Sequence, residues 1–270
     1  RLRCDWSSDV CSSDLSKEVE FYENKKNFYS IKNLKKIDLS KAAFILMRQN
    51  PPFNMDYITA TFLLEKISKK TRIVNDPFAV RNMPEKLYST KFLKLMPPTI
   101  FTKSNDEIEK FKKKYKNIII KPTHGYGGKN IFFINKSTSK KQISKYLKKH
   151  DHVMAQKFLP QIKLGDKRIF IIGGVIKGAI RRIPMKGSIV SNIGQGGKAV
   201  KTILTKRELR IAKIVASDLK KNKIVFAGID LISNYLTGDI NITSPTGLKN
   251  FKDLTGIDLA VDIWNYLEKN

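Results

Sequence analysis

Three oxygen-bearing side chains lie close together in the last quarter of the chain, at Asp230, Asp239 and Asn241. The apolar run from Ile224 to Ile232 precedes the last two, and the pattern predicts paired strands joined by a turn over residues 233–238. Because alternate residues of a strand share a face, Asp239 and Asn241 are expected to point the same way. Such oxygen ligands suit a hard cation, Mg²⁺ or Mn²⁺, that bridges to phosphates. The alternative is a polar hairpin with solvated carboxylates.

A second candidate site is the glycine-rich stretch 123–129, where Gly125, Gly127 and Gly128 lie between two predicted strands. A Rossmann or Walker loop opens a helix instead, and no Gly-Lys-Ser/Thr sequence is present. The backbone N–H groups of a glycine hairpin can bind phosphate oxygens, and Lys121 just before it can neutralise their charge. An ordinary flexible β-turn is the alternative for this loop by itself.

The chain is strongly basic, with a formal net charge of +28 over 270 residues. Its lysines are scattered in small groups on predicted helix faces, and no zinc-finger, basic-zipper or aromatic RNA-binding pattern accompanies them. This distribution favours a solvated surface without a nucleic-acid partner, although it attracts anions such as ATP. A non-enzymatic nucleic-acid-binding protein is the alternative, which salt-dependent DNA binding without ATP turnover would indicate.

The hydrophobic content of 41% is enough for the core of one large domain or two ordinary ones. No run of about 18 apolar residues is present, which argues against a membrane partner. The N-terminus also lacks the apolar segment of a signal peptide, so we expect a cytoplasmic protein.

Both cysteines, Cys4 and Cys11, lie in the first 15 residues. Residues 1–15 are rich in Ser and Asp, contain no lysine and resemble a translated sequencing adaptor, so we interpret them as a non-native segment outside the fold. The rest of the chain has no cysteine, which excludes disulfides and thiol catalysis there.

The order of apolar and polar residues predicts the elements that position these candidates. Residues 42–47, 56–69 and 72–75 are predicted as strand, helix and strand, a parallel α/β unit. Downstream, the predicted helices are 84–95, 106–115, 139–149, 205–222 and 259–267, and the predicted strands are 97–101, 117–122, 130–134, 153–158, 168–172 and 175–183.

Short motifs follow one another in a fixed order along the chain: Ile45–Phe53, Glu85–Leu87, Ile120–Pro122, Met154–Gln156, Phe158–Pro160, Gly165–Arg168, Arg182–Pro184 and Asn241–Gly247. Together they resemble the prokaryotic glutathione synthetases, a family of ATP-grasp ligases, over about residues 40–270. The resemblance implies an α/β (α+β) ATP-grasp fold, in which two α+β subdomains clasp ATP after a partial Rossmann-like domain.

The implied domains are a partial N-terminal substrate-binding domain at residues 16–83 and an ATP-grasp domain at 84–270, with subdomains 84–153 and 154–270. The family's first strand and helix are expected to precede residue 16. Because they carry part of the peptide-binding face, we expect weak or no activity from this chain.

The resemblance also implies glutathione synthase activity. ATP would phosphorylate the C-terminal carboxylate of γ-glutamylcysteine, and the glycine amine would attack the acyl phosphate to give glutathione, ADP and phosphate. The implied partners are these small molecules, with Mg²⁺ or Mn²⁺ as the metal and a homo-oligomer, a tetramer or dimer, as the assembly. The alternatives are a divergent ATP-grasp carboxylate–amine ligase with another peptide or amine, or an inactive fragment.

The roles implied by the family fall into four groups. Arg168 and Arg182 would be catalytic, because a planar guanidinium suits carboxylate and acyl-phosphate oxygens. ATP would be bound by Lys86, Lys121, Gly125, Gly127, Gly128, Gln156, Lys157, Phe158, Leu159 and Asp166, with the lysines on phosphates, residues 156–159 on adenine and Asp166 on ribose. The metal ligands would be Asp230, Asp239 and Asn241, and the peptide and glycine pocket would be lined by Arg48, Asn192, Ser244, Pro245, Thr246 and Gly247.

Four positions depart from the family pattern. His124 stands where the family has Asp, and Val190 and Lys198 stand where it has Arg. The metal strand reads Leu-Thr-Gly-Asp-Ile-Asn where the family reads Leu-Thr-Glu-Ile-Asn, so that Gly238 is inserted and Asp239 is one methylene shorter than Glu. Because Mg²⁺ tolerates little error in ligand distance, we expect altered metal affinity and phosphate-loop closure.

Overall fold

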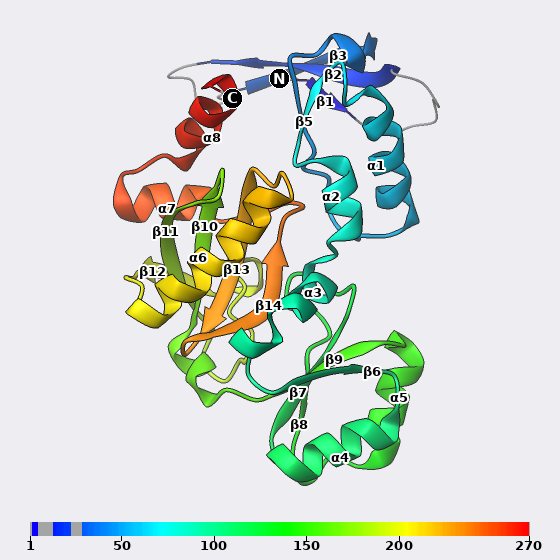
Figure 1. Ribbon diagram of the computed structural model, residues 1–270, viewed down its shortest axis with the longest axis vertical. Coiled ribbons are helices and arrows are strands. Elements are labelled where there is room, and N and C mark those ends of the chain that lie inside the picture. Colours follow the sequence, from blue (N-terminus) through cyan, green and yellow to red (C-terminus); the bar gives the residue numbers. More distant parts are fainter. Residues whose placement is uncertain (1, 5–12, 23–28, 270) are drawn as a thin grey trace.

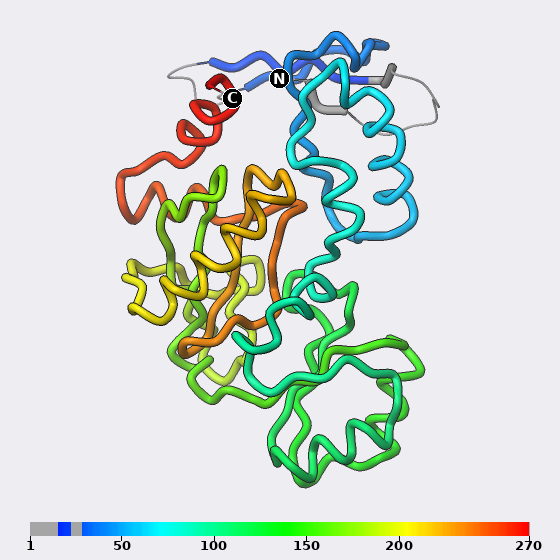
Figure 2. The backbone as a smooth tube through the Cα atoms, in the orientation of Figure 1, coloured from blue at the N-terminus to red at the C-terminus, as the bar shows by residue number. Residues whose placement is uncertain are grey.

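A computed structural model describes residues 2–4, 13–22 and 29–269 of the chain (Figure 1). Along the long axis of the molecule, the N-terminal strands and the last helix lie at one end and a four-stranded sheet lies at the other (Figure 2). A five-stranded sheet lies between them (Figure 1). No helix among the described residues combines the length and the apolar character that a bilayer crossing requires.

The first described elements form a three-stranded antiparallel sheet. Its strands are β1 (Leu2–Cys4), β2 (Ser13–Phe21) and β3 (Tyr29–Asp38). The sequence did not predict β3 because most of its positions are exposed and carry no apolar alternation. β1 and the start of β2 belong to the segment that we had excluded from the fold, whereas Cys11 lies outside the described residues.

A parallel α/β unit follows, as the sequence predicted. Its elements are η1 (Leu39–Lys41), β4 (Phe44–Leu46), α1 (Met55–Ile67), β5 (Arg72–Val74) and α2 (Pro77–Asn82). α1 begins where the Asn54 side chain accepts the Tyr57 N–H, a capping bond that satisfies an unpaired donor of the first turn. The short helix α2 was not predicted, although Asp76 caps it in the same way through the Ala79 N–H.

The four-stranded antiparallel sheet has the strand order β6-β9-β7-β8. Its elements are β6 (Thr99–Thr102), α4 (Asn105–Tyr115), β7 (Ile118–Pro122), β8 (Phe132–Ile134), α5 (Lys140–His150) and β9 (Val153–Lys157). Ile118, Ile120 and Ile134 of the sheet pack with Ile108 of α4 and Ile143 of α5 in one core cluster. This core fixes β7, the strand that carries Lys121.

The helix predicted over residues 84–95 is broken. It consists of α3 (Glu85–Tyr88) and the 3-10 helix η2 (Ser89–Leu95). The Ser89 hydroxyl donates to the Lys86 carbonyl at 2.6 Å, and the Thr90 hydroxyl donates to the Leu87 carbonyl at 2.7 Å. Such side-chain bonds compete with the helical backbone pattern, which explains a break that apolar spacing alone did not show.

The five-stranded antiparallel sheet has the order β12-β11-β10-β13-β14. Its strands are β10 (Asp166–Ile172), β11 (Val175–Ile183), β12 (Lys198–Lys201), β13 (Phe226–Ile232) and β14 (Tyr235–Asn241). The helices and short helical turns of this part are η3 (Pro160–Leu164), η4 (Ile193–Gln195), α6 (Lys206–Lys221), α7 (Leu248–Thr255) and α8 (Leu259–Lys269). Of these, β12, α7 and the short turns η3 and η4 were not predicted.

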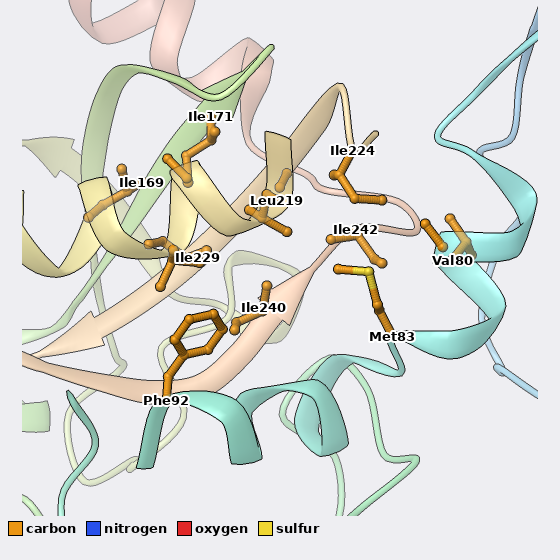
Figure 3. Packing of buried hydrophobic residues seen from close by; sticks show 14 of the residues in the cluster. Val80, Met83, Phe92, Ile169, Ile171, Leu219, Ile224, Ile229, Ile240 and Ile242 are labelled. Carbon is orange, nitrogen blue, oxygen red and sulfur yellow. The ribbon is translucent and has the colours of Figure 1, made fainter. Parts of the chain in front are cut away.

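Alternation along the strands divides the residues of this sheet between two faces. Ile169, Ile171 and Ile229 belong to the cluster that includes Leu219 of α6 (Figure 3). Phe170 and its even-numbered neighbours belong instead to a cluster with residues of α7 and α8. Residues 166, 168 and 230 share the even-numbered face, so the candidate site residues of these strands lie on the side opposite α6.

The predicted hairpin is present, but its turn is shorter than expected. It consists of Ser233 and Asn234 alone, both with positive φ (46° and 66°), and β14 already begins at Tyr235. Two-residue turns with positive φ match the twist of paired strands, and Asn tolerates that conformation. The sequence prediction over residues 233–238 was therefore wrong at its C-terminal end.

Candidate active site

Lys121 and Asp239 bring the two large sheets together. Lys121 extends from β7 and its Nζ lies 3.1 Å from Asp239 Oδ2 on β14, while Lys86 Nζ of α3 lies 3.4 Å from Asp239 Oδ1. Both lysine side chains are only 6–7% exposed. Burial opposes ionisation of Asp239, but the charges of Lys121 and Lys86 hold its pKa well below the ordinary value. The pair of lysines thus shares one ionised carboxylate.

The glycine-rich loop over residues 123–129 is hydrogen-bonded to Lys86. Lys86 Nζ donates to the Gly125 carbonyl at 2.6 Å, and the Gln195 amide donates to the Gly127 carbonyl. Gly127 and Gly128 have φ of 63° and 74°, which favours glycine. A Cβ on Gly128 would overlap the Val190 side chain, so this unexpected valine packs directly on the loop. The loop over residues 187–197 therefore meets the loop over residues 123–129.

His124 also belongs to the glycine-rich loop. Partial burial of its imidazole and the nearby charges of Lys86 and His152 lower its pKa. A lowered pKa keeps the ring neutral near pH 7. We assign this residue no catalytic role.

Two arginines and two carboxylates form a buried network on the site face of the five-stranded sheet. Asp230 accepts hydrogen bonds from both Arg168 (Nη2–Oδ2, 2.8 Å) and Arg182 (Nη2–Oδ2, 2.7 Å). Asp166 accepts two more from Arg182, one of them from Nε at 2.9 Å. Arg168 is the cross-strand partner of Asp230, and Asp166 is the partner of Arg182. The antiparallel register therefore creates these pairs.

This network changes the expectation for the two arginines. Both guanidinium groups, expected on substrate oxygens, are engaged by carboxylates and nearly inaccessible (4–5% exposed). A buried guanidinium needs such partners because an unpaired buried charge is costly. Asp166, expected on the ribose, is likewise held by Arg182, and burial raises its pKa despite that pairing. Arg168 Nη1 also lies 3.4 Å from the Thr246 carbonyl, which links the network to the loop after β14.

Asp230, Asp239 and Asn241 fit a divalent cation by the chemistry of their donors. All three are oxygen ligands on adjacent strands, and Asp230 and Asp239 are close enough for the charge of Asp239 to raise the Asp230 pKa. The arginines outweigh that effect, so both carboxylates remain ionised. Asn241 Oδ1 accepts the Ser244 N–H at 3.2 Å. Among the described residues no set of three acidic, His or Cys side chains is grouped for a metal, so phosphate and water oxygens would complete this trio.

The segment expected to contact adenine is β9 with the two residues after it. Gln156 is buried and its amide donates to Thr99 Oγ1 at 2.9 Å. The Lys157 N–H donates to the Pro98 carbonyl at 2.9 Å, and the Phe158 N–H donates to the Asn117 carbonyl at 3.0 Å. Both N–H groups already donate to neighbouring backbone. The groups left to contact adenine in this segment are therefore the Leu159 N–H and the backbone carbonyls.

Arg48 lines a cavity of about 150 Å³ between the N-terminal unit and the loop after β14. It donates to the Pro245 carbonyl at 3.0 Å, and its guanidinium lies 5.7 Å from the centre of the Phe226 ring. The Ser244 hydroxyl donates to the Gln49 carbonyl at 2.9 Å. The structure thus joins Arg48 to Pro245 and its neighbour Gln49 to Ser244, whereas Ser244, Thr246 and Gly247 do not line the cavity. Asn192 does not line this cavity, and its Nδ2 lies near Gly127 instead.

Asn75 and Trp264 also line the cavity and were missed from the sequence. The buried Asn75 amide donates to the carbonyls of Phe226 (2.8 Å) and Ile242 (2.5 Å), and its oxygen accepts the N–H groups of Val225 and Phe226. It therefore fixes β5 against β13 and the end of β14. A polar residue at the end of the strand predicted over residues 72–75 was the sequence signal for it.

Comparisons with known proteins give relatives over most of the chain. Family models of prokaryotic glutathione synthetase match residues 7–81 (N-terminal domain) and 85–256 (ATP-grasp domain). The first match begins inside the segment that we had interpreted as non-native. The glutathione synthetase of Agrobacterium fabrum is 39% identical over 257 residues, which cover 93% of this chain and 80% of that protein. That of Rhodopseudomonas palustris is 37% identical, over 97% of this chain and 83% of that protein.

Solved structures with similar folds have low sequence identity. D-cycloserine synthetase DcsG has a TM-score of 0.66 at 16% identity, and the match covers 86% of each chain. The D-alanyl-alanine synthetase A of Vibrio cholerae has a TM-score of 0.59 at 14% identity, over 98% of this chain and 82% of that one. These likenesses establish the fold alone.

Proposed function

The chain belongs to the prokaryotic glutathione synthetase family, and we propose that its two antiparallel sheets hold ATP between them while γ-glutamylcysteine is joined to glycine. It is an ATP-dependent carbon–nitrogen ligase and a glutathione synthase with the ATP-grasp fold. What remains to be proposed is which residues perform each task.

The observation that carries the proposal is the convergence of Lys86 and Lys121 on Asp239 from outside the five-stranded sheet. Four cations surround four carboxylates in this region, so their formal charges balance. They are Lys86, Lys121, Arg168 and Arg182 against Glu85, Asp166, Asp230 and Asp239. When a triphosphate binds with its metal cations, the lysines can pair with phosphate oxygens and the carboxylates with the metal. No buried charge is then left unpaired.

In this exchange, Lys86 and Lys121 donate to phosphate oxygens in place of the Asp239 carboxylate. Asp230, Asp239 and Asn241 would hold Mg²⁺ or Mn²⁺. When bound, this ion supplies charge neutralisation and a template for the phosphates. Arg182 keeps Asp230 and Asp166 oriented, so we assign it and Arg168 positioning roles in place of direct contact with the substrate.

The Arg48 cavity would hold the peptide. The Arg48 guanidinium is held by its hydrogen bond to the Pro245 carbonyl and by its contact with the Phe226 ring, and it suits the binding of a carboxylate. The peptide's terminal carboxylate attacks the γ-phosphorus of ATP, and the bond to the β-phosphate oxygen breaks to release ADP. The glycine amine then attacks the acyl carbon, phosphate leaves and the amine loses a proton. Positioning and charge neutralisation supply most of the rate in such transfers.

We further propose a domain boundary near residue 83, between the two matched regions, and a homo-oligomer, a dimer or tetramer, in the cytoplasm. Family membership supports these proposals. Light scattering of the purified protein tests the assembly, because a monomeric mass at working concentration would contradict it.

The function is tested by release of ADP and by the mass of the product. With ATP, Mg²⁺, γ-glutamylcysteine and glycine together, we expect glutathione and one ADP for each peptide, formed at the low rate expected if part of the peptide-binding face precedes residue 16. Omission of glycine should stop product formation. Turnover with another amine but not with glycine would overturn the assignment.

A further inference from the structure

β14 is irregular directly opposite Asp230. The flanking pairs are 229 with 240 and 231 with 236, so Asp230 faces three residues of β14, namely Thr237, Gly238 and Asp239. A regular antiparallel ladder would oppose one residue to one. Gly238 has a φ of +89°, in the region that favours glycine. The strand therefore forms a bulge with Gly238 at its centre.

The bulge decides where the groups on this strand point. The three residues between the flanking pairs are an odd number, as is the single residue of a regular ladder, so the alternation of faces is preserved across the bulge. Thr237, Asp239 and Asn241 therefore lie on the face that Asp230 occupies. The Thr237 hydroxyl lies 3.0 Å from both Asp239 Oδ2 and the Asp230 carbonyl. The Thr237 carbonyl accepts from Lys121 Nζ at 3.3 Å. One bulge thus presents a backbone oxygen and a carboxylate to the same lysine.

The surroundings of Gly238 leave little room for a side chain. A Cβ there would lie 2.9 Å from Met96 Cε, 3.0 Å from Met154 Sδ and 3.1 Å from Ser89 Oγ. These atoms belong to the residue after η2, to β9 and to the first residue of η2, which follows Lys86 by three. A substitution would therefore strain the backbone and push β14 away from the elements that hold Lys86.

We propose that Gly238 is a positioning residue whose bulge gives the short Asp239 carboxylate its reach to the metal and phosphate site. This inference rests on the proposed function of that site. Asp carries one methylene less than Glu, a difference of about 1.5 Å in reach. Mg²⁺ binds its ligands at about 2.1 Å with near-octahedral geometry, so a backbone displacement has to make up that difference.

The first test compares Gly238→Ala with Gly256→Ala. Gly256 has a similar φ of +79°, but apart from the adjoining backbone no atom of the described residues lies within 4 Å of the position that an alanine Cβ would take there, so it controls for backbone strain alone. Mn²⁺ binding with ADP present is measured by electron paramagnetic resonance. We expect Gly238→Ala to weaken it about tenfold or more and Gly256→Ala to change it less than about twofold. Equal affinities in both variants would overturn the inference.

The second test removes Gly238 with and without Asp239→Glu. Deletion alone should weaken Mn²⁺ binding about tenfold, whereas the longer side chain should restore it to within about threefold of the parent chain. Deletion without loss of affinity would overturn the inference. If the deletion variants do not fold, as circular dichroism would show, the alanine pair decides. If the parent chain itself binds no Mn²⁺-ADP and makes no glutathione, the proposed function fails. If it does both, but Gly238→Ala and Gly256→Ala bind Mn²⁺ with the same affinity, only the role of Gly238 fails.

Discussion

Lys121 Nζ lies 3.1 Å from Asp239 Oδ2, and this ion pair joins the four-stranded sheet to the five-stranded sheet. Lys86 contacts the other oxygen of the same carboxylate. Residues 86, 121 and 239 come from distant parts of the chain, and the fold brings them to one point. The phosphates of a nucleotide bound between the sheets would replace Asp239 as the partner of both lysines, so the predictions below begin from this contact.

Lys121→Met should reduce kcat/KM for ATP by about 10²- to 10³-fold, because a buried cation aimed at transferring phosphates is lost. Steady-state kinetics with varied ATP would show the change. Lys110→Met serves as a control, because that lysine is 74% exposed and forms a surface ion pair with Glu107 in the preceding turn. We expect it to change kcat/KM less than about twofold. Equal effects of the two substitutions would contradict the role of Lys121.

Arg182→Met should destabilise the protein by about 3–5 kcal/mol, since it leaves Asp166 and Asp230 buried without their shared partner. Urea unfolding measures the free-energy change. Lys177→Met is the comparison, because its pair with Asp262 is about 30% exposed, and we expect a loss under about 1 kcal/mol. A small loss at Arg182 would show that the buried network is not needed for stability.

The ionised state of Asp239 predicts a loss of stability in acid. Its pKa in the folded protein lies below the ordinary value of 3.8, so the unfolded chain binds the proton more readily. The stabilisation is therefore complete above the ordinary pKa and is lost as the pH falls below it. Urea unfolding between pH 3 and pH 6 should show a steeper decline for the parent chain than for Asp239→Asn. Parallel pH profiles would exclude a contribution from this carboxylate.

Arg48→Met should raise KM for γ-glutamylcysteine about tenfold or more while KM for ATP changes little, because Arg48 lies in the cavity with Pro245 and Phe226 rather than beside Lys121. Initial rates with each substrate varied in turn separate the two constants. A rise in KM for ATP alone would place Arg48 at the nucleotide.

The sequence predicted much of the fold because its strands and helices carry strong apolar patterns. The parallel unit around α1 and, apart from β12, the strands of both large sheets were recognised in this way. The exposed strand β3 and the short helix α2 were missed, since neither has a clear period.

The partners of the site residues depend on strand register, which the local sequence does not show. Arg182 is the cross-strand partner of Asp166, and this pairing, which the local sequence does not show, is the reason that we propose a positioning role for Arg182. The insertion at Gly238 was visible in the sequence, but its bulge became clear only from the pairing of β13 with β14. Asn75 was missed because its four bonds all reach segments about 150 or more residues away.

A crystal structure of the chain with Mg²⁺ and a non-hydrolysable ATP analogue tests the proposed site most directly. We predict the β- and γ-phosphates between Lys86 and Lys121, with the metal bound by Asp230, Asp239 and Asn241. If the analogue binds elsewhere while Lys121 remains paired with Asp239, the proposed site is contradicted.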